Sequence, residues 1–492
     1  MSTVAAISTP FGRGGIAVIR ISGESAISVA EKMFIPARGC DLSTFQGGRA
    51  VYGRIVSEGE MIDDGIATVF RAPNSFTGED TVEISCHGGI LLTERVLRTA
   101  FDCGAEQAGA GEFTQRAFMN GKIDLSRAEA VIGLIDAESE EKLKLCASHS
   151  EGILSKRCEE LYSRLIKLVS SVYVRLDYPE EDLSEVSDAE FSAELTAIRD
   201  ELYATERTYK QGKAVSEGIR TAIIGKPNVG KSSILNALVG EEKAIVTSVA
   251  GTTRDVIEEK INVGKVTLRL FDTAGIRESD DEVERIGIER ALKKAEEAEL
   301  ILAVFDATGA IEEGDEAIIS ILRSAIASGK PVITVMNKSD LGHHFDARSI
   351  SPVTRETSKS DAWREPVCLS GLPDSIAPVI GNSAVSPIPS VAVSARTGEG
   401  IDELKKLIES LYIEGDIDYR SVAVVANARQ HAAISSARKA VERAMAAFEG
   451  GMGADVCGLD LEFALSSLGQ VDGRAVTDEI TNEIFHNFCV GK

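Results

Sequence analysis

The segment from Gly225 to Ser232 has the sequence GKPNVGKS, in which the spacing of glycine, lysine and serine suits a bound phosphate chain. It follows the apolar run Thr221–Ile224 and precedes a helical pattern, which is the strand–loop–helix context that this motif requires. Glycines let backbone N–H groups turn toward the β-phosphate, Lys231 can reach the β- and γ-phosphates, and the Ser232 hydroxyl can ligate Mg²⁺. The alternative is a glycine-rich turn that binds nothing, and the motifs downstream disfavour it.

Two further motifs supply what a triphosphate site still needs. DTAG (272–275) follows the apolar run Val266–Phe271, so Asp272 could bind Mg²⁺ through water and the Gly275 N–H could meet the γ-phosphate. GTTRD (251–255) lies between DTAG and the glycine-rich loop and offers a switch threonine, with Thr253 the better candidate for the second Mg²⁺ ligand. These motifs predict a nucleoside triphosphate bound with magnesium.

The last two motifs predict which base is bound. NKSD (337–340) ends another apolar run, and the Asp340 carboxylate can accept hydrogen bonds from guanine N1–H and the exocyclic amine, which adenine cannot match. SAR (394–396) follows the run Val391–Val393 and fits the loop that contacts guanine O6. Each short motif alone is more often an ordinary cap or turn, but all five in chain order predict GTP rather than ATP.

The residue after DTAG departs from the usual pattern. Many GTPases have a glutamine there that orients the attacking water, whereas this chain has Ile276, whose apolar side chain cannot do so. The acidic stretch from Glu278 to Glu284 follows at once and could supply the polar group. Most residues of that stretch are expected to form a solvated acidic loop.

Alternating strands and helices must position these motifs. Apolar runs separated by helical patterns predict a doubly wound parallel sheet. The predicted strands are Thr221–Ile224, Val266–Phe271, Leu300–Phe305, Val332–Met336 and Val391–Val393, and the predicted helices include Ser232–Leu238 and Arg285–Ala298. The Ser/Pro-rich stretch from Leu341 to Ser390, with the single tryptophan Trp363, is expected to be an extended loop of the same domain.

The chain on either side of this domain has other patterns. Residues 1–120 mix short β-branched runs (Gly15–Ile21, Ile66–Phe70 and Thr81–Ser85) with Gly/Pro turns, which predicts an α+β domain. Residues 124–215 and 415–492 have helical periodicity, the latter with an Ala-rich segment from Val422 to Phe448. We therefore expect one helical domain interrupted by an inserted domain. The predicted boundaries are 1–121, 122–217, 218–414 and 415–492, the second and fourth being the two parts of the helical domain.

The composition limits the remaining possibilities. A chain of 492 residues is too long for one core, and 43% hydrophobic with 26% charged residues is ordinary for globular proteins. The net charge of −24 disfavours nucleic-acid binding through a broad basic surface. We see no apolar run long enough to span a bilayer and expect no secretory signal. Eight cysteines without CxxC spacing predict free thiols in a reducing compartment.

Over essentially its whole length the chain resembles the MnmE (TrmE) family of tRNA-modification GTPases. The resemblance rests on GRGGIAVIRISG (12–23), PNSFTGEDTVEISCHGG (73–89), GEFTQRAFMNGKIDL (111–125), AGTTRD (250–255), DTAGIRESDDEVERIGIERA (272–291) and FCVGK (488–492). It implies an N-terminal α+β domain that dimerises and binds folate, a discontinuous helical domain, and an inserted Ras-like P-loop G domain. These implied domains agree with the patterns above.

The resemblance also implies an activity. Members act in a heterotetramer with a flavin-dependent partner and install a carboxymethylaminomethyl-type group at C5 of the wobble uridine of certain tRNAs. A 5-formyl- or methylene-tetrahydrofolate donates the one-carbon unit. The G domains of a homodimer meet across their nucleotide faces, and K⁺ takes the place of an arginine finger. The chain would then be a cytoplasmic enzyme that uses GTP, Mg²⁺, K⁺, folate and tRNA and makes no membrane contact.

The resemblance assigns site residues by position. Mg²⁺ falls to Ser232 and Thr253, and Glu284 matches the water-orienting glutamate, which would compensate for Ile276. Cys489 matches the cysteine of a terminal C-x-G-K signature and is a candidate catalytic residue. The implied K⁺ ligands are Asn228, Thr247, Val249 and Thr252, and the implied folate contacts are Arg20, Glu83, Lys122 and Lys492. The expected GTP contacts are Asn228, Val229, Gly230, Lys231, Ser232, Ser233, Thr247, Ser248, Val249, Ala250, Gly251, Thr252, Thr253, Asp272, Thr273, Ala274, Gly275, Asn337, Lys338, Asp340, Ser394, Ala395 and Arg396.

Several residues have a simpler interpretation. Without the resemblance, Arg20 and Glu83 would be structural salt-bridge partners, and Cys489, next to Phe488, would be a buried, packed thiol. His87 is expected to be a structural turn residue rather than a metal ligand. Two other functions stay open: a regulatory or ribosome-assembly GTPase, which needs no folate site, and a folate-dependent one-carbon enzyme regulated by GTP.

Overall fold

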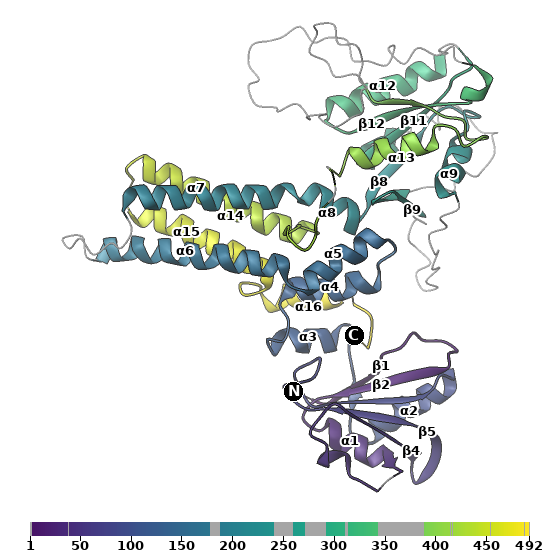
Figure 1. The fold of residues 1–492 in the computed structure, drawn as a ribbon, viewed down its shortest axis with the longest axis vertical. Helices are drawn as coiled ribbons and strands as arrows, with labels where there is room; N and C mark the ends of the chain where they lie inside the picture. The colour runs from purple at the N-terminus through teal and green to yellow at the C-terminus, as the bar shows by residue number, and fades with distance from the viewer. Residues whose placement is uncertain are drawn as a thin grey trace. The chain divides into compact units, whose positions relative to one another are not determined.

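The structure is a computed structural model that divides into two compact units (Figure 1). One unit contains Met1–Ile135, Cys146–Tyr203 and Ala432–Lys492, and the other contains Asp136–Leu145 and Ala204–His431. The residues described are 2–37, 39–177, 187–240, 259–270, 292–309, 313–342, 388–413, 415, 417–452, 454–486 and 488–491. Each unit is thus assembled from segments that are far apart in the sequence.

A seven-stranded sheet forms the N-terminal domain of the first unit. The strands have the order β3-β4-β5-β6-β2-β1-β7 and are antiparallel, apart from the parallel pair β1 and β7. They are β1 (Val4–Ile7), β2 (Ile16–Ser22), β3 (Phe34–Pro36), β4 (Arg49–Ser57), β5 (Glu60–Phe70), β6 (Thr81–His87) and β7 (Glu106–Gln107). The three predicted strands are confirmed, but β5 is longer than predicted, because it begins at Glu60 with a stretch in which three of the first five residues are charged.

One face of this sheet carries the core of the domain. Helices α1 (Ala26–Met33) and α2 (Ile90–Asp102) share a buried apolar cluster with alternate strand residues such as Ile19, Ile84 and Ala67. Residues on the opposite face of the same strands are more exposed; Ile16, for example, is 68% exposed. This alternation is the period of two that places successive side chains on opposite faces of a strand.

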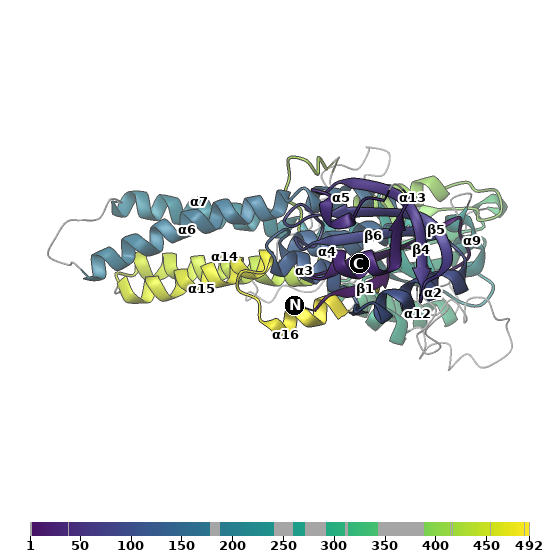
Figure 2. The ribbon, with the colours of Figure 1, turned by 90° about the horizontal axis from the view of Figure 1, so that it is seen from below.

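Helices form the rest of the first unit, as predicted. Their bounds are α3 (Glu112–Met119), α4 (Leu125–Ile135), α5 (Glu140–Ser150), α6 (Ile153–Asp177), α7 (Asp188–Arg207), α14 (Ala428–Glu449), α15 (Ala454–Asp472) and α16 (Asp478–His486), with α5, α7 and α14 also extending into the second unit. In both views α6, α7, α14 and α15 lie side by side (Figures 1 and 2). On α6 the residues that recur at three- and four-residue spacing are all buried and supply its packing face; they are Leu154, Cys158, Leu161, Leu165 and Leu168.

The second helical segment starts later than predicted. Helix α14 begins at Ala428 rather than near Val422. The Asn427 side chain accepts a hydrogen bond from the Gln430 N–H at 2.9 Å, and the Gln430 side chain accepts one from the Ala426 N–H at 3.0 Å. This reciprocal capping satisfies N–H groups that have no helical partner and thereby sets the start of the helix.

The second unit contains the predicted doubly wound sheet. Its order is β13-β12-β11-β8-β10-β9, and all neighbours are parallel except β9 and β10. The strands are β8 (Ile219–Ile224), β9 (Glu259–Val263), β10 (Val266–Leu270), β11 (Leu300–Asp306), β12 (Val332–Asn337) and β13 (Ser390–Ala392), and the helices are α8 (Tyr209–Ser216), α9 (Lys231–Val239), α12 (Glu313–Ala327) and α13 (Ile401–Ser410).

Helices cover both faces of this sheet. Along β11, Leu300, Leu302 and Val304 belong to one buried cluster, while Ile301 and Phe305 belong to the cluster on the other face. Strands buried on both sides read as continuous apolar runs, which is why these strands could be predicted. Of the predicted helix 285–298, residues 292–297 are described and are helical, and residues 343–387 of the predicted long loop lie outside the described part.

Among the helices of the described residues, none has both the length and the apolarity that crossing a bilayer requires. The seven cysteines in the described ranges, at positions 40, 86, 103, 146, 158, 457 and 489, are all free thiols. This agrees with the prediction of free cysteines.

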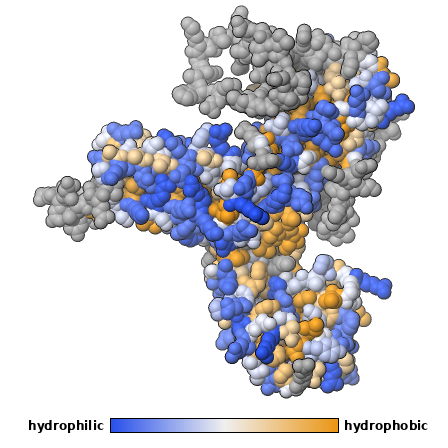
Figure 3. All heavy atoms as spheres, viewed as in Figure 1, coloured by the Kyte–Doolittle hydropathy of each residue, from blue (hydrophilic) through white to orange (hydrophobic). Residues whose placement is uncertain are grey.

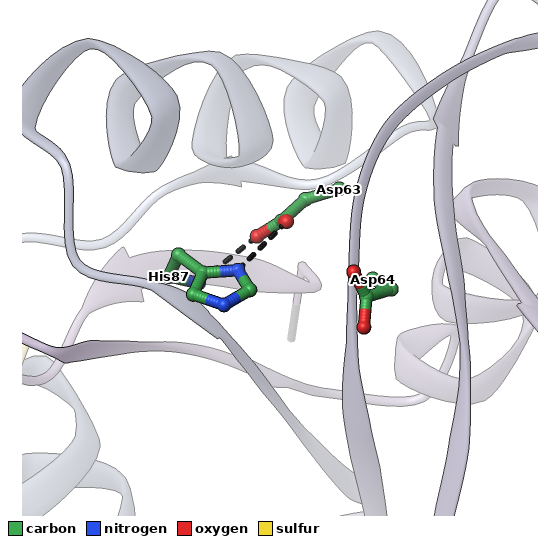
Figure 4. A group of neighbouring side chains, drawn as sticks. All are labelled: Asp63, Asp64 and His87. Carbon is green, nitrogen blue, oxygen red and sulfur yellow. Dashed lines mark hydrogen bonds and ion pairs between the residues drawn. The ribbon is translucent and has the colours of Figure 1, made fainter.

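His87 ends β6 and pairs with Asp63 on the neighbouring strand β5 (Figure 4). The His87 ring Nδ1 and backbone N–H lie 2.9 Å from the two oxygens of the Asp63 carboxylate, and the Tyr52 hydroxyl donates to Asp64 at 2.6 Å. Asp63, Asp64 and His87 are the group with metal-ligand spacing among the residues described. Because these groups bond to one another and to Tyr52, the geometry supports the structural interpretation of His87.

The pair shifts the pKa values of both partners. The hydrogen bond to Asp63 and its negative charge raise the pKa of the exposed His87. Partial burial of Asp63 would raise the pKa of that carboxyl, but the hydrogen bonds from the His87 backbone and ring outweigh burial and lower it.

We predict that Asp63→Asn lowers the pKa of His87 toward its usual value of about 6.5. Because folding raises this pKa, the charged pair contributes its full stability below the unfolded pKa, and the contribution is lost as the pH rises through the folded pKa. NMR titration of the six histidines, with His87→Gln to assign the signal, measures the shift. Asp64→Asn is the matched control because it leaves the Asp63 hydrogen bond in place. An equal fall in both variants would contradict the assignment.

Candidate functional site

The loop 225–230 lies at the carboxyl end of β8, between that strand and α9. Strand β8 has parallel neighbours on both sides, β10 and β11, and the chain leaves it in the middle of the sheet. Loops at such a point in an open α/β sheet form a crevice in which ligands bind. Helix α9 begins at Lys231, so its N-terminal N–H groups and its dipole favour an anion at the loop.

Glycine is required at two positions of this loop. A Cβ on Gly225 would lie 2.4 Å from the Val304 carbonyl oxygen of β11. Gly230 has a φ of +95°, and a Cβ there would lie 2.1 Å from the amide nitrogen of Asn337. Asn228 also has a positive φ, of 63°, which asparagine tolerates better than most residues. The loop is therefore folded tightly against β11 and β12.

Asn337 at the end of β12 joins three of the predicted motifs. Its side chain is buried, with the residue 3% exposed. The amide nitrogen donates to the Val229 carbonyl at 2.8 Å, and the amide oxygen accepts from the Ala395 N–H at 3.1 Å. The predicted GTP contact Asn337 thus connects GKPNVGKS with SAR, a positioning role that the sequence did not reveal.

The lysine and serine of GKPNVGKS lie at the start of α9. Lys231 Nζ donates to the Lys226 carbonyl at 2.7 Å, so its ammonium group points back over the loop. Ser232 is half-buried in the first helical turn, and the next residue, Ser233, is exposed. A lysine over the loop and a hydroxyl at the helix start are the groups required for phosphate and Mg²⁺.

The two loops predicted to recognise the base lie at the ends of β12 and β13. Lys338 has a φ of 64° and starts the short 3₁₀ turn Ser339–Leu341, which presents Asp340 in an exposed position. The Ser339 N–H donates to the Val393 carbonyl at 3.1 Å and links this turn to the second loop. There, Ser394 is buried and its hydroxyl accepts from the Thr397 N–H at 3.2 Å.

The other predicted nucleotide residues have a different status. Arg396 is exposed in the described part of the second loop. The ranges 241–258 and 271–291 lie outside the described residues. They contain the predicted contacts Thr247, Ser248, Val249, Ala250, Gly251, Thr252, Thr253, Asp272, Thr273, Ala274, Gly275 and Glu284.

Arg20 and Glu83 face each other across β2 and β6 in the N-terminal domain. Arg20 Nε donates to Glu83 Oε1 at 2.9 Å, and its Nη2 lies 2.8 Å from the same oxygen. The guanidinium also lies 5.5 Å from the ring centres of Phe76 and Phe113. The salt bridge considered in the simpler interpretation is therefore formed, and two aromatic rings lie near its guanidinium group.

The loop 73–80 brings a third predicted folate residue to this region. Lys122 Nζ donates to the Pro73 carbonyl at 2.8 Å, while Phe76 of the same loop contacts Arg20. A buried arginine that the sequence analysis missed, Arg116, holds the other end of the loop through Glu79 at 3.1 Å. Glu112, four residues before Arg116 on α3, is the signal that could have indicated this ion-pair network.

The C-terminal segment lies against the N-terminal domain. The Gly111 N–H donates to the Cys489 carbonyl at 3.2 Å, Val490 pairs with Ala110, and the Ser8 hydroxyl donates to the Gly491 carbonyl at 3.0 Å. Cys489 is exposed, so the expectation of a packed thiol is wrong: the backbone of the segment is paired, but the side chain points away from the core. Lys492 lies outside the described residues.

Two family models match the chain. The MnmE helical domain matches residues 125–489, and the N-terminus of the GTP-binding protein TrmE matches residues 3–122. Together these matches include both parts of the helical domain and the N-terminal sheet.

Curated proteins named tRNA modification GTPase MnmE are similar over the full length. The protein of Acetivibrio thermocellus is 37% identical over 492 residues, covering 100% of this chain and 99% of the relative. The Clostridioides difficile protein is 38% identical over 490 residues with the same coverage, and the Bacillus subtilis protein is 39% identical over 495 residues, covering 100% of both chains. A solved G domain of the FeoB iron transporter of T. maritima is 22% identical with a TM-score of 0.23, and the match covers 39% of this chain and 98% of that domain.

The domain matches, the full-length identities and the arrangement of an N-terminal α+β domain, a divided helical domain and an inserted P-loop domain agree with one another. The chain belongs to the MnmE family of tRNA modification GTPases.

Proposed function

We propose that this chain is a potassium-dependent GTPase that acts with a flavin-dependent partner on the wobble uridine of certain tRNAs. The product is a carboxymethylaminomethyl-type group at C5, with a 5-formyl- or methylene-tetrahydrofolate as the one-carbon donor. Family membership supports GTP hydrolysis and tRNA modification. The free cysteines support a reducing, cytoplasmic location.

The observation that carries the proposal is the bridge made by Asn337. It holds the carbonyl of the phosphate loop and the N–H of the guanine loop in one place, with bonds of 2.8 and 3.1 Å. A guanine nucleotide has to contact both loops at once, because its phosphates and its base lie at opposite ends. A preformed spacing between the loops reduces the ordering cost of binding.

The proposed roles follow from the chemistry of each group. Lys231 would exchange the Lys226 carbonyl for the phosphates, and Asp340 would accept the guanine N–H groups. Mg²⁺ would be held by Ser232 and Thr253 and would neutralise phosphate charge. K⁺ would be held by Asn228, Thr247, Val249 and Thr252; Asn228 suits a cation because its exposed side chain carries an amide oxygen on the loop surface. Glu284 would orient the attacking water.

The N-terminal domain is proposed to bind the folate. Arg20, Glu83 and Lys122 surround the loop 73–80, and the proposed set is completed by Lys492. A paired guanidinium and carboxylate suit a ligand that carries both a carboxylate and a polar heterocycle, since each partner can bond to a different end. Cys489, exposed in the neighbouring C-terminal segment, is the proposed catalytic thiol.

We also assign a homodimer interface to the N-terminal domain. Apolar side chains reach its surface (Figure 3); the exposed Tyr52 and Ile66 are cross-strand partners on β4 and β5, and the exposed Ile16 lies on β2, one strand beyond β6. Contiguous exposed apolar residues are typical of protein interfaces. Because the chain is strongly acidic, we propose that tRNA contacts are local and shared with the partner.

GTP hydrolysis is expected to be at least about tenfold faster in KCl than in NaCl, because a bound cation compensates the charge that develops on the transferred phosphoryl group. Steady-state phosphate release by the full chain at equal ionic strength measures the two rates. Equal rates in both salts would contradict the potassium site while leaving GTP binding untouched.

Glu284→Ala is expected to lower turnover by about 100-fold, because a residue that positions or activates the attacking water acts on the chemical step. Affinity for GTP should stay within about twofold of wild type, since the residue does not bind the base or the phosphates. Glu282→Ala, in the same acidic stretch, is the matched control and should keep its rate. A normal rate in Glu284→Ala would mean that another group positions the water.

Arg20→Ala is expected to weaken 5-formyltetrahydrofolate binding by about tenfold, because it removes a charged hydrogen-bond donor. Isothermal titration calorimetry measures the affinity, and Arg49→Ala, an exposed arginine on β4, is the control. Glu83→Gln keeps the shape of the pair and tests the carboxylate if Arg20→Ala is unstable. Unchanged affinity for 5-formyltetrahydrofolate in both variants would contradict the proposed folate site.

The tRNA reaction has its own test, which is mass spectrometry of wobble uridine from a strain without this gene. The modified base should disappear and return on complementation with the wild-type gene. A strain that keeps the modified base would favour a regulatory or ribosome-assembly GTPase.

A further inference from the structure

Two aspartates outside the five nucleotide motifs form ion pairs with lysines inside them. Asp306 is the last residue of β11, and its Oδ2 lies 2.6 Å from Nζ of Lys338 in NKSD. Asp315 is in the first turn of α12, and its Oδ2 lies 2.7 Å from Nζ of Lys226 in GKPNVGKS. One stretch of chain, the end of β11 and the start of α12, therefore reaches both the phosphate loop and the base loop.

The Asp315 pair acts on the phosphate loop. Asp315 is 4% exposed, and a buried carboxylate is costly unless it is paired. Its partner Lys226 supplies the backbone carbonyl that accepts the Lys231 ammonium at 2.7 Å. Asp315 thus fixes the residue against which the phosphate-binding lysine rests, although it has no place in the motif itself.

The Asp306 pair acts on the base loop. The Thr308 N–H and hydroxyl both donate to Asp306 Oδ1, at 3.0 and 2.6 Å, which orients Oδ2 toward Lys338. Partial burial would raise the pKa of Asp306, but the hydrogen bonds from Lys338 and Thr308 outweigh it and lower that pKa, so the carboxyl is ionised at neutral pH. Lys338 has a positive φ and starts the turn that carries Asp340.

The backbone strengthens the same connection. Asp306 is aligned with Asn337 in the parallel pair β11 and β12, and the Ala307 N–H donates to the Asn337 carbonyl at 2.8 Å. The end of β11 is therefore held against the residue that bridges the two nucleotide loops. The ion pair of Asp306 then reaches Lys338 in one of these loops, and the ion pair of Asp315 reaches Lys226 in the other.

We propose that Asp306 and Asp315 are positioning residues for the guanine nucleotide, Asp315 for its phosphates and Asp306 for its base. The proposal rests on the GTP binding proposed above and assigns a role to two residues outside the five nucleotide motifs. It separates two properties: Asp315 sets affinity for the diphosphate whatever the base, and Asp306 sets discrimination between bases.

The test compares GDP with IDP. The base of IDP lacks the exocyclic amine from which Asp340 would accept a hydrogen bond. Binding of both to full-length Asp315→Asn, Asp306→Asn and Glu316→Gln is measured by isothermal titration calorimetry. We expect Asp315→Asn to weaken GDP and IDP equally, by about tenfold. We expect Asp306→Asn to lower the GDP/IDP affinity ratio by about fivefold, because GDP has one more base contact to lose. Glu316 is the exposed neighbour of Asp315 on α12, and Glu316→Gln should bind like wild type.

A purely structural role is distinguished by the double variant Lys226→Gln/Asp315→Asn, which removes both charges and so leaves no buried unpaired group. If positioning matters, this variant folds, as judged by its melting temperature, yet still binds both nucleotides about tenfold more weakly. Wild-type affinity in the double variant would overturn the role of Asp315, and an unchanged GDP/IDP ratio in Asp306→Asn would overturn that of Asp306. Wild-type protein that binds no GDP would instead refute the proposed function itself.

Discussion

The candidate nucleotide site depends on the two hydrogen bonds made by the buried side chain of Asn337. One amide group satisfies the Val229 carbonyl of the predicted phosphate loop and the Ala395 N–H of the predicted guanine loop, and it lies so close to Gly230 that no side chain fits there. An amide can do this because it has a donor and an acceptor on one rigid plane. The spacing between two loops separated by more than a hundred residues is thereby set before any ligand arrives.

The N-terminal domain uses a different device for the same purpose. Its candidate ligand groups come from two strands, the loop 73–80 and the segment after α3, and ion pairs rather than one amide hold them together. Both sites follow one principle. In the nucleotide site, Asp315 and Asp306 lie outside the five motifs and pair with lysines inside them. In the N-terminal domain, Glu79 and Arg116 hold the loop whose Phe76 contacts the candidate residue Arg20.

Much of the fold was predictable from the sequence, for physical reasons that differ between elements. Strands of the doubly wound sheet were predicted because burial on both faces makes them continuous apolar runs, and α6 because its buried residues recur at helical spacing. The beginning of β5 was missed because residues 60–64 are mostly polar, and β1 because Val4–Ile7 is short. The start of α14 depends on the side chains of Asn427 and Gln430, which an Ala-rich pattern does not indicate.

The site was predictable as a set of motifs but not as a set of contacts. Motif spacing identifies Asn337 and Lys231 as nucleotide residues, yet that Asn337 bridges two loops and that Lys231 rests on Lys226 are tertiary facts. The exposure of Cys489 is of the same kind, because it depends on how the C-terminal segment pairs with residues 110 and 111. Local sequence carries no information about partners hundreds of residues away.

That pairing has a consequence for how the molecule is made. Ser8 bonds to Gly491 across a separation of 483 residues, so β1 and its neighbours are synthesised long before this partner exists. Domains generally fold as units during translation, the N-terminal one first. The N-terminal domain must therefore assemble and persist without this segment while the inserted domain and both helical segments emerge, and residues 110 and 111 gain these backbone partners only when residues 488–491 arrive.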